Sequence, residues 1–225
     1  MRDLFSGNEP ELVLFDLDGT LVDSVPDLSR AVDRMLLSLN RPPAGEEAVS
    51  HWVGNGAAVL VKRALAGAVD YGEVDGDLFD IAYQRFLDFY AEATAEHSQL
   101  YPGVEVCLSG LRARGISLGL ITNKPISFTE TMLQGFGLRD YFSVVIGGDS
   151  LAEKKPHPMP LLEAMSRCQA TAESTLMVGD SVHDVKAARA AGCPIACVPY
   201  GYNHGVSIAL AEPDKVLTGL EQLLD

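Results

Sequence analysis

Two aspartates separated by one residue are the most informative chemical feature of this chain. Asp16 and Asp18 follow the apolar run 12–15, and Gly19 comes next. Because side chains alternate faces along a strand, both carboxylates can point to the same side where a short buried strand ends. Carboxylates held this close repel each other unless a cation or a shared proton intervenes. The pair therefore indicates a divalent metal site, an acid–base pair, or both, although Asp-x-Asp-Gly also occurs in ordinary turns and calcium loops.

Polar side chains follow a second apolar run, and a constrained lysine comes later in the chain. Thr122 and Asn123 come directly after residues 118–121, where a hydroxyl and an amide can donate to an anion or cap the next helix. Lys155 stands beside Pro156 in a segment that its prolines hold extended, and such a segment can aim a lysine inward. Ordinary structural roles remain open for all three, since helix caps and surface lysines are common.

A second acidic pair follows the apolar run 175–178. Asp180 and Asp184 are four residues apart at a predicted strand-to-helix junction, where either can also serve the helix N-terminus. These polar residues all fall at the carboxyl ends of predicted strands, and ligands of open α/β sheets bind at that edge. Carboxylate oxygens with a few waters suit Mg²⁺, so the sequence predicts a magnesium site. Metal, lysine and backbone N–H groups would together supply the positive field that a phosphate requires.

The alternation of apolar runs with amphipathic segments predicts the fold class. Five continuous apolar runs suit strands that are buried on both faces of a parallel sheet, at 12–15, 118–121, 144–146, 175–178 and 195–198. Helical periodicity follows three of them, at about 127–136, 160–168 and 182–191. We expect an α/β protein whose core is a Rossmann-like, doubly wound parallel sheet.

The stretch between the first two strands has a different character. It lacks a good strand pattern and predicts helices at about 27–39, 46–53, 57–66 and 77–94. We expect a helical cap domain at residues 25–98, inserted after the first strand into an α/β core domain formed by residues 1–24 and 99–225. An insert at this point lies over the carboxyl ends of the strands, where a substrate would bind.

Composition limits the partners and the compartment. The formal net charge of −14 repels nucleic acid and anionic membrane surfaces, so we expect neither as a partner. No apolar stretch approaches the ~20 residues that span a bilayer, and the N-terminal residues show no signal-peptide pattern, so a cytoplasmic location is expected. The four cysteines lack a paired metal-binding spacing and are predicted to be buried free thiols. We expect a monomer or a homodimer.

The segments DLDGT, TNK, KKPHP and GDSVHD occur in this order along the chain. Together they resemble the four motifs of the haloacid dehalogenase superfamily of phosphatases. The resemblance implies that Asp16 is the nucleophile that takes the phosphoryl group, that Asp18 is the general acid and base, and that Lys155 neutralises charge beside Asp16. The residues that it places against the substrate phosphate are Gly19, Thr122 and Asn123.

The same resemblance implies a Mg²⁺ site. Asp180, the Asp16 side chain and the Asp18 backbone carbonyl would hold the ion, and Asp184 would support that shell or add a ligand. The residue types agree with this chemistry, because a carboxylate nucleophile splits hydrolysis into two displacements through an aspartyl-phosphate. Mg²⁺ and Lys155 would offset the repulsion between the phosphate and the attacking carboxylate. The implied activity is Mg²⁺-dependent hydrolysis of a small anionic phosphomonoester.

The predicted cap contains a glycine-rich turn, Gly54-Asn55-Gly56. Its unhindered backbone N–H groups can approach a small anion, although it can equally be a plain interhelical turn. The segment HWVGNGAAVLVKRAL, together with DLDGTLVDSVPDL, resembles bacterial phosphoglycolate phosphatases. That resemblance implies hydrolysis of 2-phosphoglycolate to glycolate and phosphate, with the cap turn contributing to substrate choice. The carboxylate of this substrate needs a cationic or amide partner, and we expect Arg63 of the cap to provide it.

Two alternatives remain open. The same chemistry can act on another small phosphomonoester, such as a sugar phosphate, because substrate choice depends on few cap contacts. A non-catalytic sensor of phospho-ligands belongs to a different class, and it predicts that the nucleophile, the acid–base residue or the lysine is lost. All three are present as Asp16, Asp18 and Lys155, which makes the sensor the weaker alternative.

Overall fold

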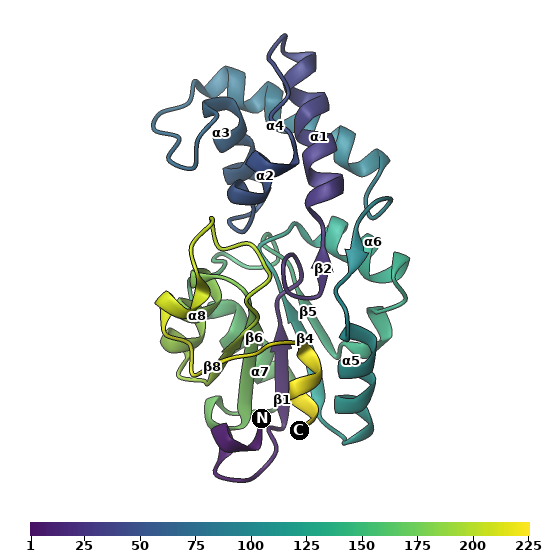
Figure 1. The fold of residues 1–225 in the computed structure, drawn as a ribbon, viewed down its shortest axis with the longest axis vertical. Helices are drawn as coiled ribbons and strands as arrows, with labels where there is room; N and C mark the ends of the chain where they lie inside the picture. The colour runs from purple at the N-terminus through teal and green to yellow at the C-terminus, as the bar shows by residue number, and fades with distance from the viewer.

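The computed structural model describes residues 1–225 and contains a parallel sheet with a group of helices beyond one end of its strands (Figure 1). The six strands lie in the order β5-β4-β1-β6-β7-β8, and every pairing between them is parallel. Their bounds are β1 Leu12–Phe15, β4 Ser117–Ile121, β5 Val144–Ile146, β6 Thr175–Gly179, β7 Ile195–Cys197 and β8 Lys215–Val216. The predicted α/β class and doubly wound sheet are confirmed, and only the two-residue β8 lies outside the five predicted strands.

Helices cover both faces of the sheet, because side chains of the buried strands alternate between two apolar clusters. Val13 and Phe15 of β1 belong to one cluster, and Leu12 and Leu14 belong to the other. The first face packs against α5 Val104–Ala113 and α6 Ile126–Gly135, and the second against α7 Met159–Cys168 and α8 Val182–Ala191. Short 3₁₀ helices complete the core at Arg2–Phe5, Arg139–Tyr141, Ala172–Ser174, Ile208–Ala211 and Leu220–Leu224.

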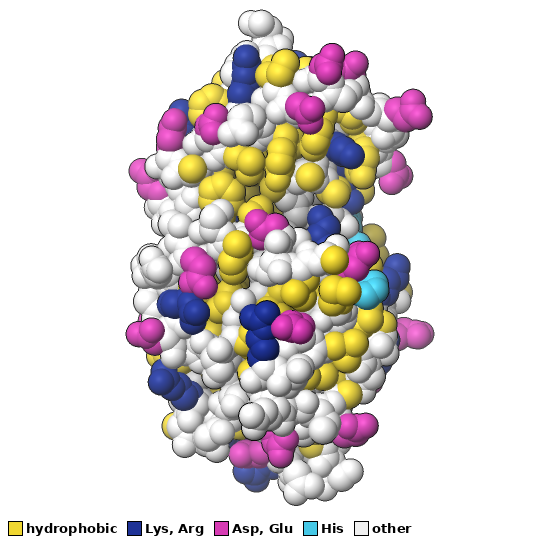
Figure 2. Space-filling view, turned by 180° about the vertical axis from the view of Figure 1, so that it is seen from behind, with side chains coloured by type: hydrophobic (Ala, Val, Ile, Leu, Met, Phe, Trp, Pro, Cys, Tyr) yellow, Lys and Arg dark blue, Asp and Glu magenta, His cyan; other side chains and the backbone are white.

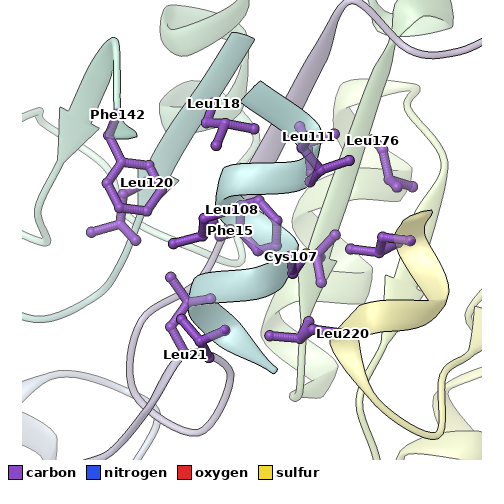
Figure 3. Packing of buried hydrophobic residues seen from close by; sticks show 14 of the residues in the cluster. Phe15, Leu21, Cys107, Leu108, Leu111, Leu118, Leu120, Phe142, Leu176 and Leu220 are labelled. Carbon is purple, nitrogen blue, oxygen red and sulfur yellow. The ribbon is translucent and has the colours of Figure 1, made fainter. Parts of the chain in front are cut away.

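The helix α5 packs on the first face of the sheet through its buried leucines. Figure 3 shows Leu108 and Leu111 of α5 beside Phe15, in a cluster that also includes Cys107. All four cysteines are free thiols, as predicted, and three of them are buried while Cys168 is half-buried. We predicted no helix at residues 104–113, so this packing is a finding of the structure.

Four helices form the insert after β1, with bounds close to the predicted ones: α1 Val25–Ser38, α2 Glu46–Trp52, α3 Ala57–Ala66 and α4 Gly76–Glu92. They pack around a separate apolar cluster that contains Met35, Trp52 and Phe86, together with Tyr202 from the core. The chain leaves and re-enters the core through an antiparallel pair, β2 Val22–Asp23 and β3 Gln99–Leu100. None of the helices combines the length and the apolar character that crossing a membrane requires.

Replacing Leu108 by alanine is expected to lower the free energy of unfolding by about 2–5 kcal/mol, because this fully buried side chain leaves a cavity between α5 and the sheet. Urea unfolding followed by circular dichroism measures the change. Leu162→Ala is the matched control: this α7 side chain is 47% exposed, and its loss is expected to change stability by only about 0.5 kcal/mol. Equal losses in the two variants would contradict this packing.

Candidate active site

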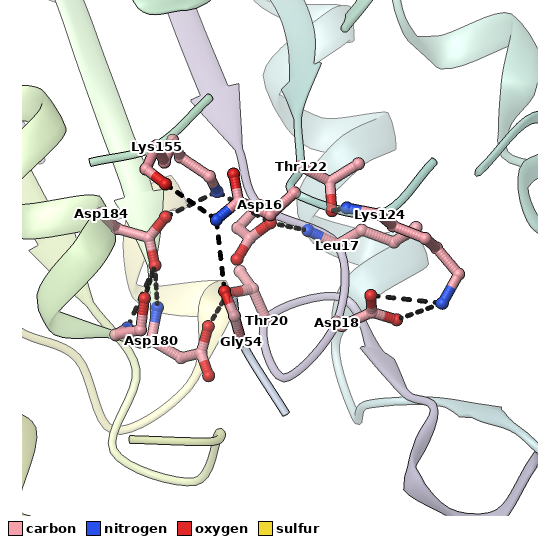
Figure 4. Close-up of polar contacts among 12 residues, drawn as sticks. Asp16, Leu17, Asp18, Thr20, Gly54, Thr122, Lys124, Lys155, Asp180 and Asp184 are labelled. Atoms are coloured by element: carbon pink, nitrogen blue, oxygen red, sulfur yellow. Dashed lines mark hydrogen bonds and ion pairs between the residues drawn. The ribbon is translucent and has the colours of Figure 1, made fainter. Parts of the chain in front are cut away.

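The polar residues singled out by the sequence meet at the carboxyl ends of three neighbouring strands (Figure 4). Asp16 follows β1, Thr122 follows β4 and Asp180 follows β6. The strand register aligns the last residue of β1 with residues near the ends of both neighbours, so the side chains that follow emerge at one level. The site therefore forms because three buried parallel strands end together below the helical insert.

Asp16 lies in a buried environment that Lys155 dominates. The Lys155 Nζ atom is 2.9 Å from Asp16 Oδ1 and 2.6 Å from Asp184 Oδ1. Burial raises the pKa of Asp16 and Lys155 lowers it, while the nearby Asp184 raises it again, and the result is a pKa of about 7. Burial alone would lower the pKa of Lys155, but the two carboxylates outweigh it and hold this pKa above its usual value. Lys155 is therefore a fixed cation beside Asp16.

Three buried carboxylates crowd together at this point. Asp16, Asp180 and Asp184 can each offer one oxygen such that all three oxygens lie within 4.8 Å of one another. The Asp180 carboxylate accepts hydrogen bonds from the Thr20 hydroxyl, at 3.0 Å, and from the Tyr202 backbone N–H. Burial and the charges of Asp16 and Asp184 raise the pKa of Asp180 well above its usual value. Oxygen ligands crowded in this way, with too little positive charge among them, fit a divalent cation.

Asp184 is the most fully engaged of the three acids. Its Oδ2 accepts from the Ser181 N–H at 3.1 Å and the Ser181 hydroxyl at 2.7 Å, which closes a capping box at the start of α8. Its Oδ1 contacts Lys155. Burial would raise the pKa of Asp184, but Lys155 and the Ser181 hydrogen bonds outweigh it and keep this pKa below its usual value. Both Asp184 oxygens therefore have protein partners, and these partners hold the carboxylate beside Asp16 and Asp180.

Asp18 points to the other side of the site, toward Lys124. The Lys124 Nζ atom lies 3.0 Å and 3.2 Å from the two Asp18 oxygens, and 4.8 Å from the ring centre of Tyr90 in α4. The sequence motifs gave Lys124 no role, although it directly follows Thr122 and Asn123. Its position shortly after a predicted strand could have indicated a role in the site. Most lysines lie on the surface, however, so this position alone did not distinguish Lys124.

Thr122 and Asn123 differ in how free their side chains are. The Thr122 Oγ1 atom accepts the Lys124 backbone N–H at 3.2 Å, and its hydroxyl hydrogen has no protein acceptor. The Asn123 amide donates to the Lys155 carbonyl at 2.9 Å and to the Gly54 carbonyl at 3.3 Å. The Thr122 hydroxyl is thus free to donate to a ligand, whereas the Asn123 amide joins the core to the insert.

The turn Gly54-Asn55-Gly56 lies between α2 and α3 and closes over the strand ends. A Cβ atom on Gly56, which has a φ of 87°, would lie 2.8 Å from the Asn123 carbonyl oxygen, so only glycine permits this approach. The Asn55 Nδ2 atom is 2.7 Å from His183 Nε2, and the Asn55 carbonyl accepts from Lys154 at 3.0 Å. His183 of α8 therefore contacts the insert.

Gly19 and Arg63 are not among the residues that line the cavity between the core and the insert. A Cβ atom on Gly19 would lie 2.2 Å from Asp180 Oδ2, so this glycine packs against the acidic cluster. The Arg63 guanidinium donates to the carbonyls of Trp52 and Val69, at 2.7 Å and 3.0 Å, and to Asn55 Oδ1 at 3.0 Å. Arg63 supports the turn and does not reach the place where we expected it to meet a substrate carboxylate.

A cavity lies between the core and the insert, directly above Asp16, and encloses about 490 Å³ including its mouth. One side is polar and is formed by Asp16, Asp18, Thr122, Asn123 and Lys124. The other side is largely apolar, and the insert contributes Gly54 and Gly56 to it along with Leu28, Val53, Ala57, Leu60, Phe86 and Tyr90. On the molecular face that Figure 2 draws, Lys and Arg are scattered among acidic side chains.

The chain belongs to the haloacid dehalogenase-like hydrolases, because their family model matches residues 13–198. It is 52% identical to a phosphoglycolate phosphatase from Pseudomonas putida, over 99% of this chain and 82% of that protein. It is 49% identical to a phosphoglycolate phosphatase from Nitrosococcus oceani, over 96% of this chain and 95% of that protein. A crystal structure of a predicted phosphoglycolate phosphatase from Haemophilus somnus superposes with a TM-score of 0.90 at 38% identity, covering 96% of this chain and 97% of that one.

The Arg63→Ala variant is expected to lose about 1–3 kcal/mol of stability, because its removal leaves partly buried backbone carbonyls without a donor. Thermal or urea unfolding measures this loss, and Lys62→Ala, which removes the neighbouring cation, is the control. We expect KM to change alike for phosphate esters with and without a carboxylate. A KM increase confined to carboxylate-bearing substrates, at unchanged stability, would contradict this and show that Arg63 binds the substrate carboxylate, as the sequence led us to expect.

Proposed function

We propose that this protein hydrolyses 2-phosphoglycolate to glycolate and inorganic phosphate, with Mg²⁺ as the bound cation. The observation that carries the proposal is the convergence of Asp16, Lys155 and the acidic cluster on one buried point under a small cavity. The likeness to phosphoglycolate phosphatases, at 52% and 49% identity over nearly the whole chain, supports this substrate among other phosphomonoesters.

Asp16 is the proposed nucleophile. Its Oδ1 atom is held by Lys155 and by the Leu17 N–H, at 2.9 Å and 2.8 Å, which leaves Oδ2 for attack on phosphorus. The attack forms the bond between Asp16 and phosphorus and breaks the bond to the glycolate oxygen, giving an aspartyl-phosphate. Lys155 stabilises the negative charge that gathers around this centre, and the Thr122 hydroxyl donates to a phosphate oxygen.

Asp18 is the proposed proton carrier. It lines the same cavity as Asp16, and its side chain is 14% exposed. In the first step Asp18 would give a proton to the departing glycolate oxygen. In the second it would take a proton from the water that attacks the aspartyl-phosphate, which releases inorganic phosphate and restores Asp16.

The acidic cluster would hold the Mg²⁺ ion. We assign Asp16 and Asp180 as side-chain ligands and the Asp18 backbone carbonyl as a third protein ligand, with Asp184 holding this arrangement through Lys155 and α8. When bound, the ion supplies positive charge to the phosphate oxygens and lowers their repulsion with Asp16. The raised pKa values of Asp16 and Asp180 support this assignment, because they reflect buried negative charge that a cation would compensate.

We infer further that residues 25–98 act as a cap domain on a core of residues 1–24 and 99–225. The insert has its own apolar cluster, to which the core adds few residues. Near the site, polar contacts join the two parts: Asn55 to His183 and Lys154, and Gly54 to Asn123. Such contacts can break without exposing a hydrophobic core, so the cap can open for substrate entry and close to exclude bulk water.

A phosphate-release assay over small phosphomonoesters tests the proposed activity. We expect the highest kcat/KM for 2-phosphoglycolate, and we expect Asp16→Asn to reduce kcat by at least ~1,000-fold because it removes the nucleophile. Asp88→Asn, away from the cavity on α4, is the control and should keep wild-type turnover. Equal kcat/KM for sugar phosphates would reject the substrate, and wild-type turnover by Asp16→Asn would reject the mechanism.

Removing the metal provides a second test. Chelation with EDTA is expected to abolish phosphate release, and added Mg²⁺ should restore it. Because Mg²⁺ would bind the folded acidic cluster, a concentration of about 100 times its Kd should stabilise the protein by about 2.7 kcal/mol and raise its melting temperature. The Asp180→Asn variant should show a much smaller increase. An equal thermal shift in wild type and Asp180→Asn would place the metal elsewhere.

A further inference from the structure

Lys124 is a buried lysine that the proposed hydrolysis does not use. Its side chain is 4% exposed, and its Nζ atom contacts both Asp18 oxygens and the face of the Tyr90 ring. Burial lowers the pKa of Lys124, but Asp18 and Tyr90 raise it more, so the amine remains a cation. A buried charge is costly unless it is paired, so Lys124 needs an anionic partner whenever Asp18 turns away from it.

Lys124 is the only residue with a cationic side chain among those that line the cavity. Lys155 lies behind Asp16, bonded to it and to Asp184, and Arg63 is turned toward backbone carbonyls of the insert. The remaining wall is largely apolar. A ligand with a second negative group, bound to a protein of net charge −14, must find its counter-charge inside the cavity, and Lys124 alone offers it there.

Tyr90 adds an unpaired donor beside this lysine. Its hydroxyl is buried and has no hydrogen-bond partner, although its ring lines the cavity. Ring contacts with Phe86 and Phe128, at centroid distances of 5.7 Å and 4.9 Å, hold the tyrosine in place. A buried hydroxyl without a partner is costly, and an oxygen of a ligand would satisfy it.

The functional groups lie in the order in which the groups of 2-phosphoglycolate are joined. Figure 4 shows Asp16 at the centre of the site, Asp18 to one side of it, and the Lys124 ammonium beyond Asp18. The phosphorus of the substrate belongs at Asp16 and its bridging oxygen at Asp18. One methylene group further along the molecule comes the carboxylate, and on this side of Asp18 the protein offers Lys124 and, beside it, Tyr90.

We propose that Lys124, with the Tyr90 hydroxyl as a second donor, binds the carboxylate of the substrate and thereby determines specificity. The inference rests on the proposed function, because it assigns a partner to the second anionic group of that substrate. Binding would also give Lys124 a new anionic partner, which weakens its hold on both Asp18 oxygens and lets Asp18 turn to the bridging oxygen. A phosphate ester without a carboxylate would gain neither effect.

A comparison of 2-phosphoglycolate with ethyl phosphate, which has a methyl group in place of the carboxylate, tests this assignment. Lys124→Met is expected to lower the preference for 2-phosphoglycolate over ethyl phosphate, measured as the ratio of their kcat/KM values, by about 10- to 100-fold, the size expected for one charge-assisted contact. A loss that acts through the Asp18 ion pair falls on both substrates alike and leaves this ratio unchanged. Lys124→Arg should recover part of the loss because it keeps the charge. Lys62→Met is the matched control, since Lys62 packs on Phe79 outside the cavity and should leave both substrates unaffected.

The outcomes separate this inference from the proposed function. Equal losses on both substrates in Lys124→Met would mean that the lysine acts only through Asp18, and would overturn the carboxylate site. A wild-type preference for 2-phosphoglycolate that survives in Lys124→Met would overturn it as well, while leaving the proposed function intact. A wild-type enzyme that turns over other phosphomonoesters but does not prefer 2-phosphoglycolate would instead reject the substrate itself.

Tyr90→Phe provides an independent test that does not disturb the Asp18 ion pair. It removes only the unpaired hydroxyl, and we expect KM for 2-phosphoglycolate to rise by about 10-fold with little change for ethyl phosphate. Thermal melting checks the fold of each variant. If Lys124→Met does not fold, an unchanged KM in a folded Tyr90→Phe enzyme overturns the proposed two-donor site.

Discussion

The ion pair of Lys155 with Asp16 and Asp184 is the interaction on which the site depends. The ends of β1 and β6 and the first turn of α8 bring three carboxylates into a buried space, where mutual repulsion would otherwise drive them apart. Lys155 supplies one positive charge. Its partner Asp184 forms the capping box of α8 with Ser181, so the ion pair is connected to this helix. One ammonium group thus ties Asp16, at the end of β1, to Asp184 in α8, and the negative charge still left uncompensated is what the proposed metal would balance.

The molecule has two kinds of internal interface, one apolar and one polar. Inside each part, large apolar clusters hold the sheet to its helices and the insert helices to one another. Between the parts, near the site, single hydrogen bonds from Asn55, Lys154 and Asn123 predominate. Polar contacts exchange with water at little net cost, whereas apolar clusters do not. The close approach of Gly56 to the Asn123 carbonyl lets the insert lie tightly over the cavity without an apolar contact at this point.

Sequence patterns predicted the sheet well because continuous apolar runs between amphipathic helices are typical of buried parallel strands, and 12–15 and 144–146 agree with β1 and β5 residue for residue. The short β8, with its charged Lys215, carries no comparable pattern. The helix α5 was not predicted, although its apolar residues Val104, Cys107, Leu108 and Leu111 recur at helical spacing. The site residues of the core were recognisable in the sequence because they directly follow predicted strands. Side-chain direction was not: nothing in the local sequence tells that Arg63 turns to backbone carbonyls or that Lys124 turns into the cavity. Both outcomes depend on which neighbouring groups lack partners, which only the assembled fold decides.

The strongly negative surface then sets a limit on what the site can recognise. A phosphate ester that protrudes from the cavity stays within the field of a protein with net charge −14, and each additional exposed anionic group adds to that repulsion. A molecule small enough to lie wholly inside would place its phosphate beside the Asp16–Lys155 pair and its second anionic group near Lys124, in a space of low dielectric where each charge acts strongly. Enclosure therefore does more than exclude water. An anion that the surface repels is attracted inside the cavity. This holds only for a substrate whose phosphate can lie at Asp16 while its second negative group lies at Lys124.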